Sequence, residues 1–281
     1  MKLLSAVRIN FLRWREDPKY LMVLLFLGMY FWRQMHGFVD YARDMGCTMT
    51  PWLLAFLPSG TVILPIMLGY VLLISDAPFR NGQQQFVLLR TGKRTWLWGQ
   101  ILYLLLLSAL FPVLLWIFSW IFMLPALEWS LEWGAGITTA AATGAYGGYS
   151  WIAMEYSCMK NASPLEATIW VMAAMTAVCF LLAMITAGCN LWFRRGVGPV
   201  AVTALSAMPV IVIIFAHQPN AIKKLLWVSP VSWLDRSLMG HTEQGLPPLN
   251  YGLVMPVVLS LILCGVLVGT IHKCDVETEE V

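Results

Sequence analysis

Five long runs of apolar residues constrain the fold of this chain more than any other feature of its sequence. They cover residues 52–75, 101–124, 167–193, 199–216 and 251–271. A helix of about 20 mostly apolar residues is long enough to cross the hydrocarbon core of a bilayer. Of the 281 residues, 59% are hydrophobic and 12% are charged, and a soluble chain of this size needs more polar residues to cover its surface. The sequence therefore predicts an integral membrane protein.

A sixth apolar run begins near Tyr20 and is interrupted by Arg33 and His36. We expect the helix to continue to about residue 41, with these two side chains near the outer interface or facing protein. The predicted fold is an all-α polytopic membrane protein with six transmembrane helices, at 20–41 and at the five runs above. Residues 1–281 then form a single transmembrane domain.

The distribution of basic residues predicts the orientation of the spans. With six spans, twelve of the 18 lysines and arginines fall on the side of the chain termini and six on the other side. Cytoplasmic loops carry an excess of such residues, so both termini are predicted to be cytoplasmic. Segments 125–166 and 217–250 are then outer-side segments. Two questions stay open: whether 134–149 enters the membrane, and whether Cys47 and Cys158 form a disulfide.

Residues 1–19 have the pattern of an amphipathic helix lying at the cytoplasmic interface. At helical spacing, apolar side chains fall on one face and arginines on another, and Asp17-Pro18 ends the helix. The residues that define this interfacial elbow helix are Arg8, Phe11, Trp14 and Arg15, with Leu4 and Val7 on the apolar face. The alternative is an ordinary flanking segment whose arginines extend to the headgroups.

The segment 76–100 between the second and third spans is the most informative polar stretch. Residues 82–89 have the composition of two helical turns, and Lys93-Arg94 place the segment at the inner surface. A short helix held between two spans is suited to transmit motion from a soluble partner into the membrane. The candidate coupling residues are Asp76, Phe79, Arg80, Gly82, Phe86, Arg90, Lys93 and Arg94. The alternative is a solvated basic loop.

The sequence offers little chemistry for catalysis or for cofactor binding. It contains no phosphate-binding loop, no paired histidines and no CxxC spacing, and the middle of each predicted span lacks Asp and Glu. We therefore predict neither an enzyme nor a bound metal or cofactor.

Asp235 and Arg236 are expected to form a local ion pair. Small polar residues inside the second and fifth spans either line a pore or satisfy the local backbone; they are Ser59, Thr61, Thr203 and Ser206.

This layout resembles the permease subunits of type-2 ABC transporters, chiefly bacterial exporters. The resemblance rests on the elbow helix, the six spans and the loop between spans two and three, with Gln100 near the place where many members have a lysine. A further similarity is the Pro-containing apolar stretch 227–234. The long outer segment 125–166 departs from the usual pattern of the family.

Membership would imply several partners and a cellular location. These are separate ABC ATPase subunits that bind ATP and Mg²⁺, a second permease copy or a related permease, and the lipids of a bacterial plasma membrane. The pore would lie between the permeases and be lined by spans two and five. The 14 tryptophans and 16 methionines suit an amphipathic or lipid-like exported substrate.

Three other functions remain as alternatives. A secondary transporter requires inverted repeats and buried ionisable groups, and we find neither in the sequence. A lipid-modifying membrane enzyme requires a cluster of reactive side chains, for which His241 and Glu243 are the nearest approach. A non-transporting sensing or assembly subunit of an ABC complex would share the permease fold.

Overall fold

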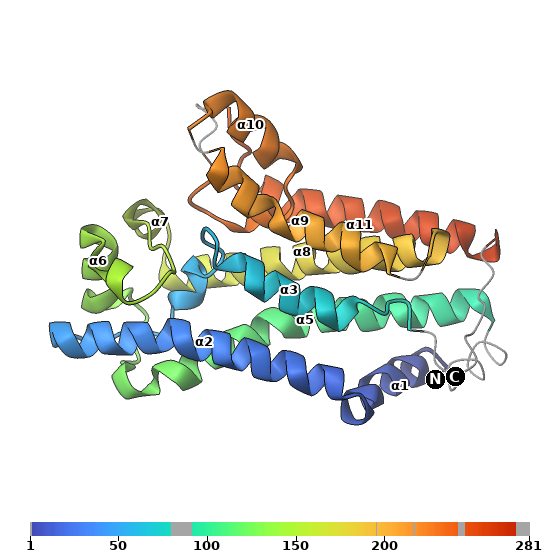
Figure 1. Ribbon diagram of the computed structural model, residues 1–281, viewed down its shortest axis with the longest axis horizontal. Helices are drawn as coiled ribbons and strands as arrows, with labels where there is room; N and C mark the ends of the chain where they lie inside the picture. The colour runs from blue at the N-terminus through green and yellow to red at the C-terminus, as the bar shows by residue number, and fades with distance from the viewer. Residues whose placement is uncertain (1, 80–91, 195, 216, 241–244, 274–281) are drawn as a thin grey trace.

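The fold is an elongated bundle of helices that run up and down its long axis (Figure 1). The computed structural model describes residues 2–79, 92–194, 196–215, 217–240 and 245–273. Within these ranges the chain contains no β-strand, only an isolated bridge between Met49 and Leu127. The predicted all-α class is therefore confirmed for the described part of the chain.

The bundle is built from long helices joined by shorter ones. The long helices are α1 (Lys2–Glu16), α2 (Pro18–Met45), α5 (Lys93–Met123), α8 (Pro164–Trp192), α9 (Val197–Ile214) and α11 (Tyr251–Thr270). The shorter α-helices are α3 (Ile63–Ile74), α6 (Gly134–Thr143), α7 (Tyr156–Lys160) and α10 (Pro219–Val228). Short 3₁₀ turns are η1 (Leu53–Phe56), η2 (Leu124–Ala126), η3 (Ala145–Gly148), η4 (Val231–Leu234) and η6 (Ile271–Lys273).

Four helical segments are long and apolar enough to cross a membrane. They are Lys93–Ala126, Pro164–Trp192, Val197–Ile214 and Tyr251–Thr270. Many large apolar side chains of these helices face outward rather than into the bundle, as on Val257 and Leu261 of α11. Such outward-facing apolar surface suits contact with lipid, and the chain is therefore a membrane protein by the length and composition of its helices.

Helix α2 covers the predicted span 20–41 and extends beyond it at both ends. Asp17 caps its N-terminus by accepting a hydrogen bond from the backbone N–H of Lys19 at 3.0 Å, and Pro18 occupies the first turn. The helix ends at Gly46, whose φ of 61° is left-handed. Its 28 residues correspond to a length of about 42 Å. Its second half carries Arg33 and Asp40, which makes it less apolar than the four segments above.

The segment 52–75 is not one continuous helix, and this part of the prediction is wrong. Turn η1 is followed by irregular turns at residues 57–62, and regular helix begins only at Ile63. Pro58 lacks a backbone donor, and Gly60 has a φ of 56°, so neither fits a helix interior. The remaining 12-residue helix α3 has a length of about 18 Å, shorter than the roughly 30 Å of a hydrocarbon core.

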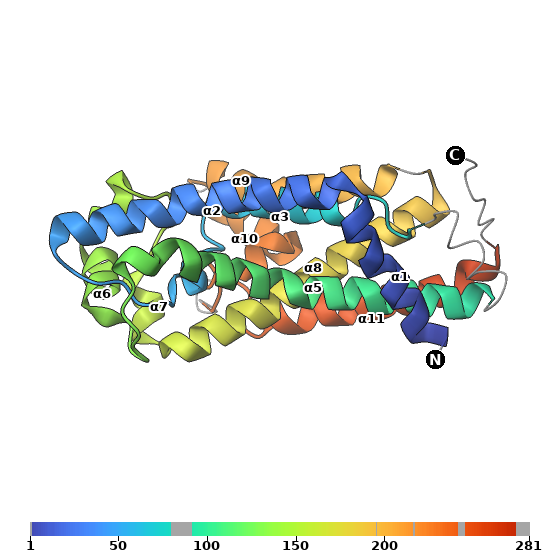
Figure 2. The same ribbon diagram turned by 90° about the horizontal axis from the view of Figure 1, so that it is seen from below.

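The two ends of the bundle differ in structure. Helix α1 and turn η6 lie at one end, and α6 and α7 lie at the other (Figures 1 and 2). Helix α8 occupies the centre and packs against α5, α9 and α11. The 10-residue helix α6 has a length of about 15 Å and is too short to cross a bilayer. We call these the α1 end and the α6–α7 end.

Helix α1 packs against α5 through the apolar face that the sequence predicts. Val7 is buried, the ring of Phe11 meets that of Tyr103 edge-on at 4.9 Å, and Trp14 stacks on Tyr20 at 5.3 Å. The indole N–H of Trp14 also donates to the hydroxyl of Tyr103 at 2.9 Å. Arg8 and Arg15 are exposed. The helix is therefore amphipathic, and its apolar face is covered by protein at these contacts.

Candidate functional site

The segment that joins α3 to α5 is held firmly where it leaves the bundle. After α3, the Lys19 ammonium contacts the Asp76 carboxylate at 2.6 Å and the Ser75 hydroxyl at 2.8 Å. Of the predicted coupling residues, Arg80, Gly82, Phe86 and Arg90 lie outside the described residues. Lys93 and Arg94 begin α5, and Arg94 is exposed at the α1 end.

Asn190, near the C-terminus of α8, ties this segment to the α8–α9 turn. Its side-chain Nδ2 donates to the backbone carbonyls of Ser75 at 3.1 Å and Ala77 at 2.7 Å. Its Oδ1 accepts from the backbone N–H groups of Gly196 at 3.2 Å and Gly198 at 3.0 Å. One buried amide therefore links the α8–α9 turn to residues 75–77, which lie more than 110 positions away in sequence.

A second buried amide holds the same segment from the side of α5. Gln100 is 1% exposed, and its Oε1 accepts from the backbone N–H of Phe79 and from Nδ2 of Asn10, both at 3.3 Å. The Phe79 ring is fully buried and meets Tyr103 edge-on at 5.3 Å. Phe79, expected as a coupling residue, is thus placed inside the bundle, where it anchors the segment and is covered from solvent.

The four predicted pore-lining residues do not gather in one place. Ser59 is buried and its hydroxyl accepts from the backbone N–H of Ala153 at 3.0 Å, whereas Thr61 is exposed. On α9, Thr203 is exposed and Ser206 is fully buried, with a hydroxyl that has no hydrogen-bond partner. Of the four, Ser59 lines a cavity that other described residues complete.

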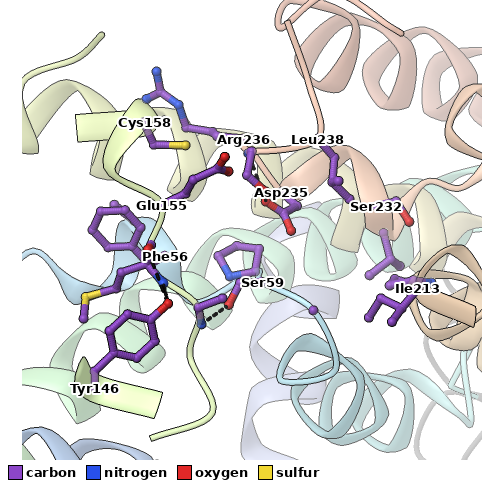
Figure 3. A pocket seen from close by; sticks show the side chains of 18 residues that line it. Phe56, Ser59, Tyr146, Glu155, Cys158, Ile213, Ser232, Asp235, Arg236 and Leu238 are labelled. Carbon is purple, nitrogen blue, oxygen red and sulfur yellow. Dashed lines mark hydrogen bonds between the residues drawn. The ribbon is translucent and has the colours of Figure 1, made fainter. Parts of the chain in front are cut away.

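That cavity lies at the α6–α7 end and has a volume of about 360 Å³. Its walls come from the turns before α3, from the chain around η3 and α7, from the C-terminal half of α9, and from η4 and the residues that follow it (Figure 3). Most of the lining is apolar, and Phe56, Met154 and Ile213 are examples. The charged residues among its lining are Glu155, Asp235 and Arg236.

The expected ion pair between Asp235 and Arg236 does not form. The Asp235 carboxylate accepts instead from the backbone N–H and the hydroxyl of Ser237, at 3.0 and 2.6 Å. The Arg236 guanidinium lies 5.5 Å from the ring centroid of Trp170, and its buried Nη1 has no hydrogen-bond acceptor. Adjacent residues in an extended turn point in different directions, so neighbouring positions in sequence did not bring the two charges together.

Burial is the largest influence on the pKa of the Asp235 carboxyl. It raises the pKa of this carboxyl above its usual value, and the nearby Glu155 carboxylate raises it further, while the hydrogen bonds from Ser237 lower it. Burial likewise raises the pKa of the Cys158 thiol, which is free, as is Cys47. The question of a Cys47–Cys158 disulfide is therefore answered in the negative for this structure.

Residues 227–234, which resemble the apolar stretch after span five of the permease family, comprise the end of α10, the residues Ser229 and Pro230, and η4. The hydroxyls of Ser229 and Ser232 lie 2.6 Å apart, and the Trp233 indole N–H donates to the carbonyl of Leu226 at 2.7 Å. In the part of the chain that the structure describes, no three His, Cys, Asp or Glu side chains are grouped to hold a metal ion.

Comparison with known proteins gives no further assignment. No protein-family model, no curated protein and no solved structure matches the chain. The sequence reasoning missed Asn190, Asn10 and Glu155. The signal for Asn190 was a lone amide within an apolar run, which requires hydrogen-bond partners when it is buried.

Proposed function

We propose that this chain is the membrane-spanning permease subunit of a type-2 ABC transporter, energised by a separate ATPase subunit. In this proposal six segments cross a bacterial plasma membrane, α2, the η1–α3 segment, α5, α8, α9 and α11, and both termini are cytoplasmic. ATP and Mg²⁺ bind to the ATPase, which docks near the segment between α3 and α5. A second permease, identical or related, completes the pathway for an amphipathic or lipid-like substrate.

The anchoring of residues 76–79, directly after α3, is the observation that carries the proposal. A loop that only connects two spans needs no buried attachment, whereas this one is bonded to α2 by Lys19, to α8 by Asn190 and to α5 by Gln100. Since Asn190 also bonds Gly196 and Gly198, a displacement of the segment would be passed to the start of α9. This is the coupling that an ATPase in trans requires.

The placement of the chain ends is a second support. The α1 and η6 ends lie together, as an even number of traverses requires, and the segment between α3 and α5 leaves the bundle at that same end (Figures 1 and 2). The exposed basic residues Arg8, Arg15 and Arg94 also lie on α1 and at the start of α5. Basic residues favour the cytoplasmic side of a membrane.

A pull-down from the native membrane tests the proposal. The tagged chain is purified in detergent, and co-purified proteins are identified and assayed for ATP hydrolysis. We expect an ATPase subunit with the wild-type chain, and roughly tenfold less of it with Arg94→Glu, because reversing a charge at a docking surface weakens association. Lys160→Glu, an exposed lysine of α7 at the opposite end, is the matched control and should retain the ATPase.

Two outcomes would contradict the proposal. The first is a wild-type chain that purifies without any ATPase. The second is an ATPase that is lost equally from Arg94→Glu and Lys160→Glu, because binding would then not depend on the α1 end.

A further inference from the structure

The cavity at the α6–α7 end presents two carboxylates that lack a cationic partner. Among the described residues, no lysine, arginine or histidine lies within salt-bridge distance of Glu155 or Asp235. Figure 3 shows both carboxylates at the cavity, with the guanidinium of Arg236 directed past Cys158 and away from Asp235. The cavity therefore has a net negative lining, with two acidic groups and one basic group.

Two aromatic rings also line the cavity, those of Phe56 and Tyr146. Tyr146 is held in place because its hydroxyl accepts from the backbone N–H of Met154 at 2.9 Å and donates to the carbonyl of Met154 at 3.3 Å. The Phe56 ring packs against Trp133 with a centroid distance of 5.2 Å. Fixed aromatic faces attract cations through the ring quadrupole, most strongly where water is excluded.

The electrostatics of the cavity favour a cation that enters from outside. Burial, and then the Glu155 carboxylate, raise the pKa of Asp235, against the hydrogen bonds from Ser237 and Gly60 that lower it. No described cation lies within salt-bridge distance of either carboxylate. A bound cation would offset both the mutual repulsion and the loss of hydration. Arg236 does not supply this charge, because it rests on the ring of Trp170.

We propose that this cavity binds an organic ammonium group attached to an apolar body, with Glu155 and Asp235 facing the charge and Phe56 and Tyr146 facing the N-methyl or methylene groups. A volume of about 360 Å³ is in the range of pockets that hold small organic ligands. The group has two sources, a lipid headgroup or a free amphipathic amine. The proposal stands independently of the ABC assignment, since it concerns the opposite end of the bundle.

The test uses two probes of the same shape and different charge. The full chain is placed in nanodiscs of phosphatidylglycerol, and binding of phenyltrimethylammonium is measured by equilibrium dialysis against protein-free nanodiscs. Its neutral isostere tert-butylbenzene is measured in the same way. We expect saturable binding of the cation and at least about tenfold weaker binding of the isostere, because only the cation gains the charge interaction.

Three variants change the charge of the cavity. Two of them remove a negative charge, and the third removes the positive charge. Glu155→Gln and Asp235→Asn should each weaken binding of the cation by about tenfold. Arg236→Met keeps the length of the side chain, removes the positive charge, and should strengthen binding by a few-fold. Glu155 is exposed, so its substitution is not expected to disturb folding, which size-exclusion chromatography checks.

The lipid composition distinguishes the two sources of the ammonium group. If phosphatidylethanolamine in the nanodiscs competes with phenyltrimethylammonium, the ligand is a lipid headgroup; if it does not, the ligand is a free amine. The proposal is overturned if the cation does not bind saturably, if the neutral isostere binds equally well, or if Glu155→Gln and Arg236→Met shift the affinity in the same direction.

Discussion

At the scale of single residues, the buried amide of Asn190 attaches the chain at Ser75 and Ala77 to the α8–α9 turn. Its Nδ2 donates to backbone carbonyls just after α3, and its Oδ1 accepts from backbone N–H groups at the start of α9. Leaving buried backbone groups without partners costs about 1–3 kcal/mol each. The stability of the fold therefore depends on this side chain, and so does the coupling that we propose.

Asn190→Ala should lower the free energy of unfolding by about 2–4 kcal/mol, because the substitution leaves several of these backbone groups unpaired. Urea or thermal unfolding in one detergent measures the effect. The control is Asn220→Ala, an exposed position on α10, which should change stability by less than about 0.5 kcal/mol. Equal effects of the two substitutions would contradict the role of Asn190.

Asp235→Asn should stabilise the protein at neutral pH. Burial raises the pKa of Asp235 in the folded state above its unfolded value, so the folded state favours the protonated carboxyl. The stability that this contributes is present below the unfolded pKa and is lost as pH rises through the folded pKa. Asparagine stays neutral throughout and still accepts the hydrogen bonds from Ser237.

The pH dependence of unfolding checks this assignment. The melting temperature of Asp235→Asn should exceed that of the wild type at pH 7, and the difference should shrink as the pH is lowered towards the usual pKa of an aspartate. A variant that is less stable than the wild type at pH 7 would show that the ionised carboxylate stabilises the fold.

At the scale of helices, the apolar runs predicted α8, α9 and α11 to within three residues at each end. A run of lipid-crossing length is a signal within one stretch of sequence, and it needs no knowledge of neighbours. In the segment before α3, Pro58 and Gly60 are local signals of a break, but the bond from Ala153 that holds the turn at Ser59 comes from far along the chain and could not be predicted. The amide contacts of Asn190 and Gln100 also join residues that are far apart in sequence, and they could not be predicted for the same reason.

The close contact of α8 with α9 gives a prediction at this scale. A Cβ atom on Gly198 would lie 2.5 Å from the carbonyl oxygen of Thr186, so the two helices would have to separate. Gly198→Ala should therefore destabilise the protein by about 1–3 kcal/mol. Gly269→Ala on α11 is the matched control, because its Cβ meets nothing within 4 Å, and it should be neutral or slightly stabilising.

Thermal unfolding of the two glycine variants measures this difference. If Gly198→Ala is as stable as Gly269→Ala, the helices do not approach each other as closely as described. Both substitutions add the same methyl group within a helix. A loss of stability in Gly198→Ala alone would therefore be due to the close contact of α8 with α9.

At the scale of the whole molecule, four segments have the length and apolar composition of membrane spans. The six-span arrangement adds the less apolar helix α2 and the short helix α3, and it is a proposal. It separates an α1 end, which holds the exposed Arg8, Arg15 and Arg94, from an α6–α7 end, which holds the acidic cavity. Only an arrangement in which the α1 end faces the cytoplasm brings the 76–92 segment to an ATPase.

The most direct test of this arrangement is the side of the membrane that each end faces. Single cysteines at Arg94→Cys and Lys160→Cys, in a background from which the native cysteines have been replaced, are labelled in intact cells with a membrane-impermeant maleimide. We predict that Lys160→Cys is labelled in intact cells and that Arg94→Cys is labelled only after the membrane is permeabilised. Labelling of Arg94→Cys in intact cells would contradict the cytoplasmic placement of the segment, and with it the proposed ATPase-driven permease.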